Sequence, residues 1–98
     1  MTAQSEKGTG YDSVWDAIAA TPGEAENMKI RSRLMMALRE HIEQLDLTQA
    51  QAAKLLGVTQ PRISDLMRGR IDLFAIDTLV NMLGAAGLQV DLRIGKAA

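Results

Sequence analysis

The segment from Thr48 to Gly69 constrains the fold of this chain more than any other stretch, and it reads TQAQAAKLLGVTQPRISDLMRG. Thr48 is a good helix N-cap, and Gly57 stands where a helix ends, because glycine adopts positive φ without a Cβ clash. Thr59 can start a second helix, with Pro61 in its first turn, where the missing N–H costs nothing. The segment therefore predicts two short helices joined by a tight turn, a helix-turn-helix.

This segment also combines the residue types that a close crossing of two helices requires. Ala53 is small where the first helix must approach the second, and Gly57 allows the turn between them. Ile63, Leu66 and Met67 lie on one side of the second helix and are expected to face the core. The combination is more specific than a pair of amphipathic helices and favours DNA binding. The alternative is a helical hairpin that serves only for packing.

The same residues resemble the Xre/Cro type of helix-turn-helix repressor. The resemblance rests on Thr48-Gln49 at the start of the first helix, Leu56-Gly57-Val58 at the turn and Ile63-Ser64 on the second helix. It implies an all-α, five-helix domain of the lambda-repressor-like fold. It also implies a sequence-specific, DNA-binding transcriptional regulator.

The N-terminal region is expected to contain a flexible tail and a short helix. Residues 1–12 are mostly polar and lack hydrophobic periodicity, which is typical of a flexible tail. Residues 11–20 contain Val14, Trp15 and Ile18, a one-sided apolar patch on a short helix. We interpret this helix as an arm that lies over the domain, and a partner-binding site is the alternative.

One long helix before the motif and one helix after it complete the predicted domain. Thr21 and Glu24 form a capping-box pattern with a proline between them, so a helix should begin here and run to about Leu45. Residues 75–86 show helical periodicity, and Gly87 is the expected stop. A chain of 98 residues can form one such core but is too short for two. The predicted layout is a helical domain over residues 13–87 and a C-terminal strand over residues 88–95.

After Gly87 the spacing of apolar residues changes from helical periodicity to strict alternation, which predicts a C-terminal strand. Apolar residues alternate there with polar ones, at Leu88, Val90, Leu92 and Ile94. A lone strand cannot satisfy its own backbone, and a two-fold axis would pair it antiparallel with its copy in a second subunit. An axis at Leu92 sets opposite charges face to face, whereas an axis one residue earlier opposes two carboxylates. We therefore predict a homodimer joined by a ribbon centred near Leu92. A frayed tail, or a strand added to another protein's sheet, is the alternative.

Positive charge is concentrated in the predicted helix-turn-helix. The whole chain has a net charge of −1, yet residues 48–70 carry four basic side chains against one acidic. Residues 1–27 carry one basic side chain against five acidic. Attraction to phosphates depends on the charge of the contacting surface and not on the net charge of the chain, so the motif remains suited to binding double-stranded DNA. The predicted dimer would place two such motifs on a palindromic operator.

The helical wheel of the second helix assigns the predicted DNA contacts. The expected base-reading residues are Gln60, Pro61, Arg62, Ser64 and Asp65. Gln60 can pair with adenine, Arg62 with guanine or a phosphate, and Asp65 with cytosine N4. Asp65 can instead form an ion pair with Arg62 or Arg68. The resemblance supports Gln60, Pro61 and Asp65 as base-facing, and Gln49 as a phosphate contact that braces Gln60.

Phosphate contacts are expected around these base-reading residues. The predicted set is Thr48, Gln49, Lys54, Thr59, Arg68 and Arg70. For Lys54, Arg68 and Arg70 the alternative is an ordinary solvated surface charge.

The resemblance extends to a narrower group, the HigA-like antitoxins. It is carried by Ser13 to Asp16, Arg31-Ser32, Leu47 to Ala50, Gln60 to Arg62 and Ile71 to Phe74. It implies a dimeric repressor of its own operon that also neutralises a RelE/HigB-like toxin ribonuclease. Such toxins are typically basic, so the acidic segment from Asp12 to Glu26 is the expected contact. A free-standing or phage-type repressor without a toxin is the alternative.

Other classes of protein are disfavoured by what the sequence lacks. It has no cysteine, and His41 has no second imidazole or thiol beside it, so neither a metal site nor a cofactor is expected. No strained nucleophile turn and no phosphate-binding loop is present, so an enzyme is not expected. No apolar run approaches the roughly 20 residues that span a bilayer, and the N-terminus lacks a signal-peptide core. We expect a cytoplasmic protein without membrane contact.

Overall fold

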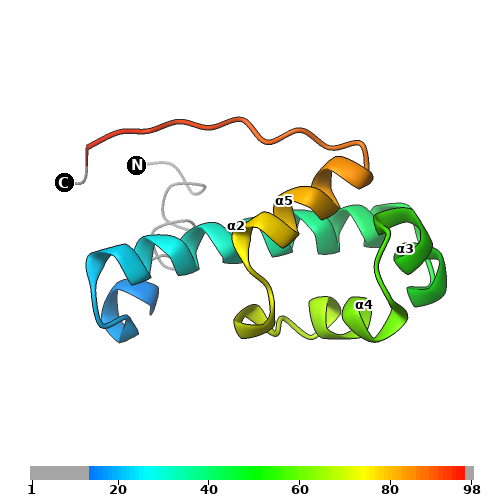
Figure 1. Ribbon diagram of the computed structural model, residues 1–98, viewed down its shortest axis with the longest axis horizontal. Coiled ribbons are helices and arrows are strands. Elements are labelled where there is room, and N and C mark those ends of the chain that lie inside the picture. The colour runs from blue at the N-terminus through cyan, green and yellow to red at the C-terminus, as the bar shows by residue number, and fades with distance from the viewer. Residues whose placement is uncertain (1–13, 97–98) are drawn as a thin grey trace.

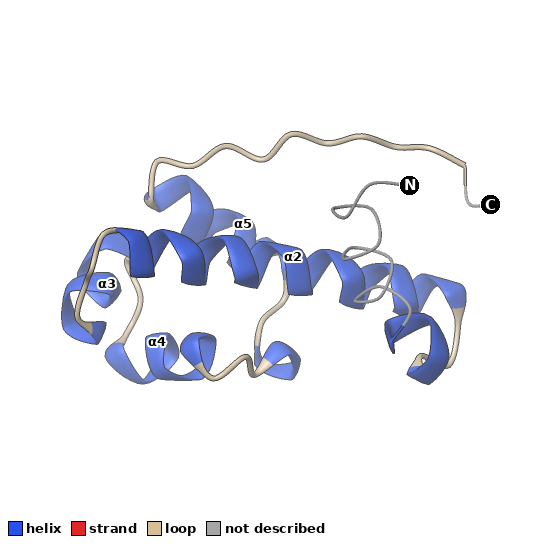
Figure 2. Ribbon diagram, turned by 180° about the vertical axis from the view of Figure 1, so that it is seen from behind, coloured by secondary structure: helices blue, strands red, loops and turns tan. Residues whose placement is uncertain are grey.

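The computed structural model describes residues 14–96, and the predicted flexible tail over residues 1–12 lies outside them. Residues 14–18 are helical. The further elements are α2 (Pro22–Gln44), α3 (Gln49–Leu56), α4 (Gln60–Met67), the 3-10 turn η1 (Ile71–Leu73) and α5 (Ile76–Ala85). Every regular element in the described part of the chain is a helix, as Figure 2 shows. The predicted all-α class is confirmed.

The long helix α2 is the axis around which the others pack (Figure 1). Its start agrees with the sequence signal, because the Thr21 Oγ1 atom accepts a hydrogen bond of 3.0 Å from the Glu24 backbone N–H. Its end is one residue earlier than predicted, with Leu45 as the C-cap. In Figure 1 the helix α5 lies along one side of α2, and α4 lies on the other side.

The core lies where α2, the helix-turn-helix and α5 meet. The largest fully buried side chains come from α2, α4, α5 and the segment before α5, namely Phe74, Leu38, Ile63, Leu66, Leu79 and Met82. Phe74, between η1 and α5, has a side chain that is only 1% exposed. It anchors the segment between α4 and α5 in the core.

The short N-terminal helix lies against the first half of α2. An ion pair of 2.9 Å joins Lys29 Nζ to Asp16 Oδ1, and Trp15 is partly buried. Val14 and Ile18 remain 53% and 66% exposed. The arm predicted over the domain is therefore present, but only Trp15 of its apolar patch packs against the domain.

The C-terminal segment, residues 88–96, corrects one expectation. No strand occurs there, and Figure 1 shows an extended run that passes back above α5 and α2. The Leu88 backbone N–H is tied to the Leu83 carbonyl at 2.9 Å, whereas Leu92 and Ile94 are 80% and 89% exposed. A strand needs a hydrogen-bonded neighbour, and the described chain offers none. The predicted strand and ribbon are absent from the single chain.

Candidate nucleic-acid interface

The first helix of the motif begins with a reciprocal cap. Thr48 Oγ1 accepts from the Gln51 backbone N–H at 3.1 Å, and the Thr48 backbone N–H donates to Gln51 Oε1 at 2.9 Å. The predicted cap at Thr48 is confirmed. Gln51 was not singled out from the sequence, although a Gln three residues after a Thr is the known signal for this box. The cap fixes the start of α3, where the predicted phosphate contacts Thr48 and Gln49 are exposed.

The turn between α3 and α4 has the predicted geometry. Gly57 has φ of +69°, in the left-handed region, and the Val58 backbone N–H bonds to the Ala53 carbonyl at 3.0 Å. Ala52 and Ala53 are 0% and 8% exposed, so small side chains line the close approach of the two helices. The crossing inferred from the sequence is therefore confirmed, and it holds α4 at a fixed angle to α3.

The second helix begins at a different kind of cap. Thr59 has the extended backbone of an N-cap residue, but its hydroxyl makes no capping hydrogen bond. Pro61 lies in the first turn, as predicted. Because the Thr59 side chain is exposed and uncommitted to the helix, its hydroxyl is free to serve as the predicted phosphate contact.

The two faces of α4 differ sharply. Ile63 and Leu66 are 0% exposed and hold the helix on the core. Gln60 and Pro61 are exposed at the N-terminal end, and Ser64 and Asp65 are partly exposed one turn later. This places four predicted base-reading residues on the part of α4 that the core does not cover. A recognition helix enters the major groove with this end.

Arg62 differs from these four residues. Its Nη1 donates to the Leu73 carbonyl at 2.9 Å, and its guanidinium carbon lies 4.8 Å from the centre of the Phe74 ring. These two contacts hold Leu73 and Phe74, in the segment that leads to α5, against α4. These contacts give Arg62 a role in positioning α4, while its contact with guanine or a phosphate stays a prediction.

The basic side chains of the motif are partly engaged with carboxylates. Arg68 Nη2 lies 3.2 Å from Asp65 Oδ1, and Arg70 Nε lies 3.7 Å from Asp72 Oδ1. Asp65 is therefore paired with Arg68, one of the two arginines that the sequence offered as its ion-pair partner. Exposed ion pairs of this kind contribute little stability, so both arginines can exchange their partner for a phosphate. Lys54 is exposed on α3.

Among residues 14–96 no three His, Asp or Glu side chains gather as metal ligands. His41 is partly buried in the last turn of α2. In the same described range, no helix has both the length and the apolar content to cross a bilayer.

Comparison with known proteins agrees with this geometry. The sequence matches a family model described as "Helix-turn-helix domain" over residues 19–95. A solved structure that carries the provisional description of an XRE family transcriptional regulator is 34% identical in sequence and superposes with a TM-score of 0.69. The match covers 76% of this chain and 83% of that one. No curated protein matches the chain.

Proposed function

Because this chain belongs to the helix-turn-helix domain family and is an XRE-type DNA-binding transcriptional regulator, we propose that it acts as a homodimeric repressor of a palindromic operator. The observation that carries the proposal is the division of α4 into two faces. Ile63 and Leu66 are fully buried, while Gln60 and Pro61 are exposed at the end of the helix that enters the groove.

The proposed readout assigns a role to each exposed group on this face. Gln60 makes a bidentate pair with adenine, and Pro61 contacts a thymine methyl. Asp65 accepts from cytosine N4 while Arg68, its ion-pair partner at 3.2 Å, swings to a phosphate. Ser64, partly exposed beside them, donates to a base edge.

The proposed phosphate contacts surround this readout. Thr48 and Gln49 at the start of α3 and Thr59 at the start of α4 would fix the register of the protein on the duplex. Lys54 and Arg70 add positive charge at its edges. Each of these side chains is exposed. Gln49 would also brace Gln60, as the family resemblance implies.

The proposed dimer uses the C-terminal segment. Residues 88–96 are extended, and Leu92 and Ile94 present apolar side chains that the chain itself does not cover. Pairing with a second copy about Leu92 would satisfy the backbone, set Val90 against Ile94 and oppose Asp91 to Arg93. Two copies of α4 held about 34 Å apart would then read two half-sites.

The test is selection of bound DNA from a random pool at fixed salt, with wild type, Leu92→Asp and Gln89→Asp. Gln89→Asp is the matched control, because it adds the same charge to the same segment on the polar face of the alternation. We expect wild type and the control to select palindromes and to sediment as dimers. Leu92→Asp should sediment as a monomer and select single half-sites.

Two outcomes would overturn parts of this proposal separately. A wild type that stays monomeric at micromolar concentration would remove the ribbon. If Gln60→Ala selected the same sequences with the same affinity as wild type, the assigned face of α4 would be wrong even if the dimer were correct.

A second function, as an antitoxin, is favoured by the N-terminal end of the molecule. Val14 and Ile18 are exposed on the N-terminal helix, and the same end of the described chain carries the exposed acidic residues Glu24, Glu26 and Asp16, the last of which pairs with Lys29. This surface lies at the opposite end of α2 from α3 (Figure 1), so a bound basic protein would leave α4 open to DNA. A RelE/HigB-like toxin has the chemistry that this apolar and acidic surface fits.

This second function has a direct test. If an open reading frame beside the gene encodes a small basic protein of about 100 residues, the two purified chains should form a stable complex. Ile18→Lys should weaken the complex at least about tenfold, since it places a cation in a contact with a basic partner. Leu45→Lys, at the other end of α2, is the control and should bind as wild type. Equal binding of all three would place the toxin elsewhere.

A further inference from the structure

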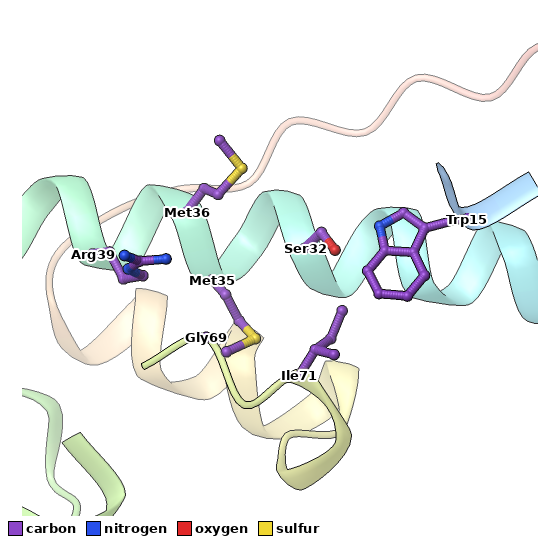
Figure 3. A pocket seen from close by; sticks show the side chains of 7 residues that line it. All are labelled: Trp15, Ser32, Met35, Met36, Arg39, Gly69 and Ile71. Carbon is purple, nitrogen blue, oxygen red and sulfur yellow. The ribbon is translucent and has the colours of Figure 1, made fainter. Parts of the chain in front are cut away.

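Arg39 belongs to α2, outside the helix-turn-helix, but its side chain reaches the end of the motif. A Cβ atom placed on Gly69, the residue after the C-cap of α4, would lie 3.7 Å from Arg39 Nη1. Figure 3 shows both residues toward the same end of a small pocket, with Trp15 at the other end. The guanidinium group of Arg39 therefore lies beside the backbone turn that leaves α4.

The guanidinium group of Arg39 has no partner in the described chain. Of its nitrogens only Nε is buried without a hydrogen bond, and Arg39 forms no ion pair with any described carboxylate. Glu40 and Glu43 line a neighbouring pocket together with Arg39, yet neither of them pairs with it. The residue is partly exposed, so Nη1 and Nη2 keep access to solvent. The charge is available to an anion from outside the chain.

The turn at Gly69 lies where the backbone of bound DNA is expected. Arg68 and Arg70 flank Gly69 in sequence and are exposed, so positive charge from two separate segments is placed at this turn. The major groove is about 12 Å wide, and a helix with its side chains fills it, so the two phosphate backbones run along both sides of the helix. The recognition helix enters the groove with its N-terminal end, which leaves the turn after its C-terminal end at the edge of the groove.

We propose that Arg39 binds a DNA phosphate at this edge, so that α2 joins the helix-turn-helix in holding the duplex. The inference rests on the proposed function and extends its binding surface to α2. Arg68 and Arg70 must first exchange a carboxylate for the phosphate, whereas Arg39 has none to release. Its buried Nε also shows that the side chain is already held in place, so little conformational entropy is lost when the phosphate binds.

The test is the salt dependence of operator binding by the full-length protein. Wild type, Arg39→Gln, Arg39→Lys and Arg33→Gln are titrated with the DNA that wild type selects, at salt from about 50 to 200 mM. Arg39→Gln should lessen the slope of log K against log salt by about 0.9 for each bound chain, because one phosphate contact is lost. It should still select the same sequences, since phosphate contacts carry no base information.

Two of these variants separate a phosphate contact from other effects. Arg39→Lys keeps the charge and should keep the wild-type slope. Arg33→Gln removes the same charge from α2 at a residue that lines a different pocket, with Glu26, Lys29 and Ile30, and should leave the slope unchanged. Circular dichroism checks that each variant is folded. If Arg39→Gln is not folded, Arg39→Met, which keeps an apolar stem without the charge, takes its place.

A structural role for Arg39 gives a different result. A cation near the C-terminal end of α4 also stabilises that helix, and folded Arg39→Gln would then weaken binding equally at every salt concentration. That outcome overturns the inference, as does an equal loss of slope in Arg33→Gln or in Arg39→Lys. Each of these results leaves the proposed function standing, because wild type still selects an operator. A wild type that selects no DNA would overturn the proposed function and this inference with it.

Discussion

The helix-turn-helix and the C-terminal segment are equally apolar in pattern but opposite in what covers them. In α4, Ile63 and Leu66 are 0% exposed, and the helix packs against α3 and α2. In residues 88–96, Leu92 and Ile94 are 80% and 89% exposed. The apolar side chains of α4 are buried within one chain, whereas Leu92 and Ile94 are left uncovered by the described residues.

The difference shows where sequence periodicity is sufficient to define structure. A helix satisfies its own backbone, so an amphipathic helix needs only a core to pack on. A strand satisfies its backbone only through a neighbour. An equally clear apolar pattern therefore predicts a helix in the motif, whereas in residues 88–96 it predicts a strand only where a hydrogen-bonding neighbour is present.

The largest expected effect is the loss of stability when a leucine of α4 is replaced by alanine, and the same replacement in the C-terminal segment is its comparison. Leu66→Ala removes a fully buried side chain and should lower the free energy of unfolding by about 2–5 kcal/mol. Leu92→Ala should change it by less than about 0.5 kcal/mol at protein concentrations where the chain is monomeric. Urea titration of both variants beside wild type measures the two values.

Raising the protein concentration sharpens this comparison. If the ribbon forms, the loss caused by Leu92→Ala should grow with concentration, because dimerisation stabilises the folded state by mass action. A loss at Leu92 as large as that at Leu66 in dilute solution would show that the C-terminal segment packs on its own chain, contrary to the exposure observed.

Much of the helix-turn-helix can be predicted from sequence because its signals are local. Gly57 ends α3 at φ of +69°, and Thr48 caps it through a residue three positions away. The placement of Arg62 and Phe74 cannot be read in this way. The Arg62 guanidinium bonds to a carbonyl eleven residues along the chain, and this contact exists only once the core has formed. The burial of Phe74 has the same cause.

A second, intermediate effect is expected at Arg62. Arg62→Ala removes the hydrogen bond to Leu73 and the contact with the Phe74 ring, and should destabilise the fold by about 1–2 kcal/mol. It should also lower operator affinity without changing the preferred sequence, since the whole of α4 is affected. Thermal unfolding and selection of bound DNA give the two readouts.

Arg68→Ala is the control for this experiment. Its side chain is 64% exposed and its partner is Asp65, so stability should change by less than about 0.5 kcal/mol. If Arg62→Ala left stability unchanged and relaxed the choice of base at one operator position, Arg62 would be a base-reading residue, as the sequence predicted, and its contacts with Leu73 and Phe74 would be unimportant.

The smallest expected effect distinguishes the two N-caps inside the motif. Thr48 takes part in a reciprocal capping box, so Thr48→Ala should lower the free energy of unfolding by about 1 kcal/mol. Thr59 makes no capping hydrogen bond, so Thr59→Ala should change it by only a few tenths of that value. Both should weaken operator binding if both hydroxyls contact phosphate, and each should lessen its salt dependence very little, because neither carries charge. Equal destabilisation by the two substitutions would mean that the Thr59 hydroxyl caps α4 in solution, and it would then no longer be free for the backbone of DNA.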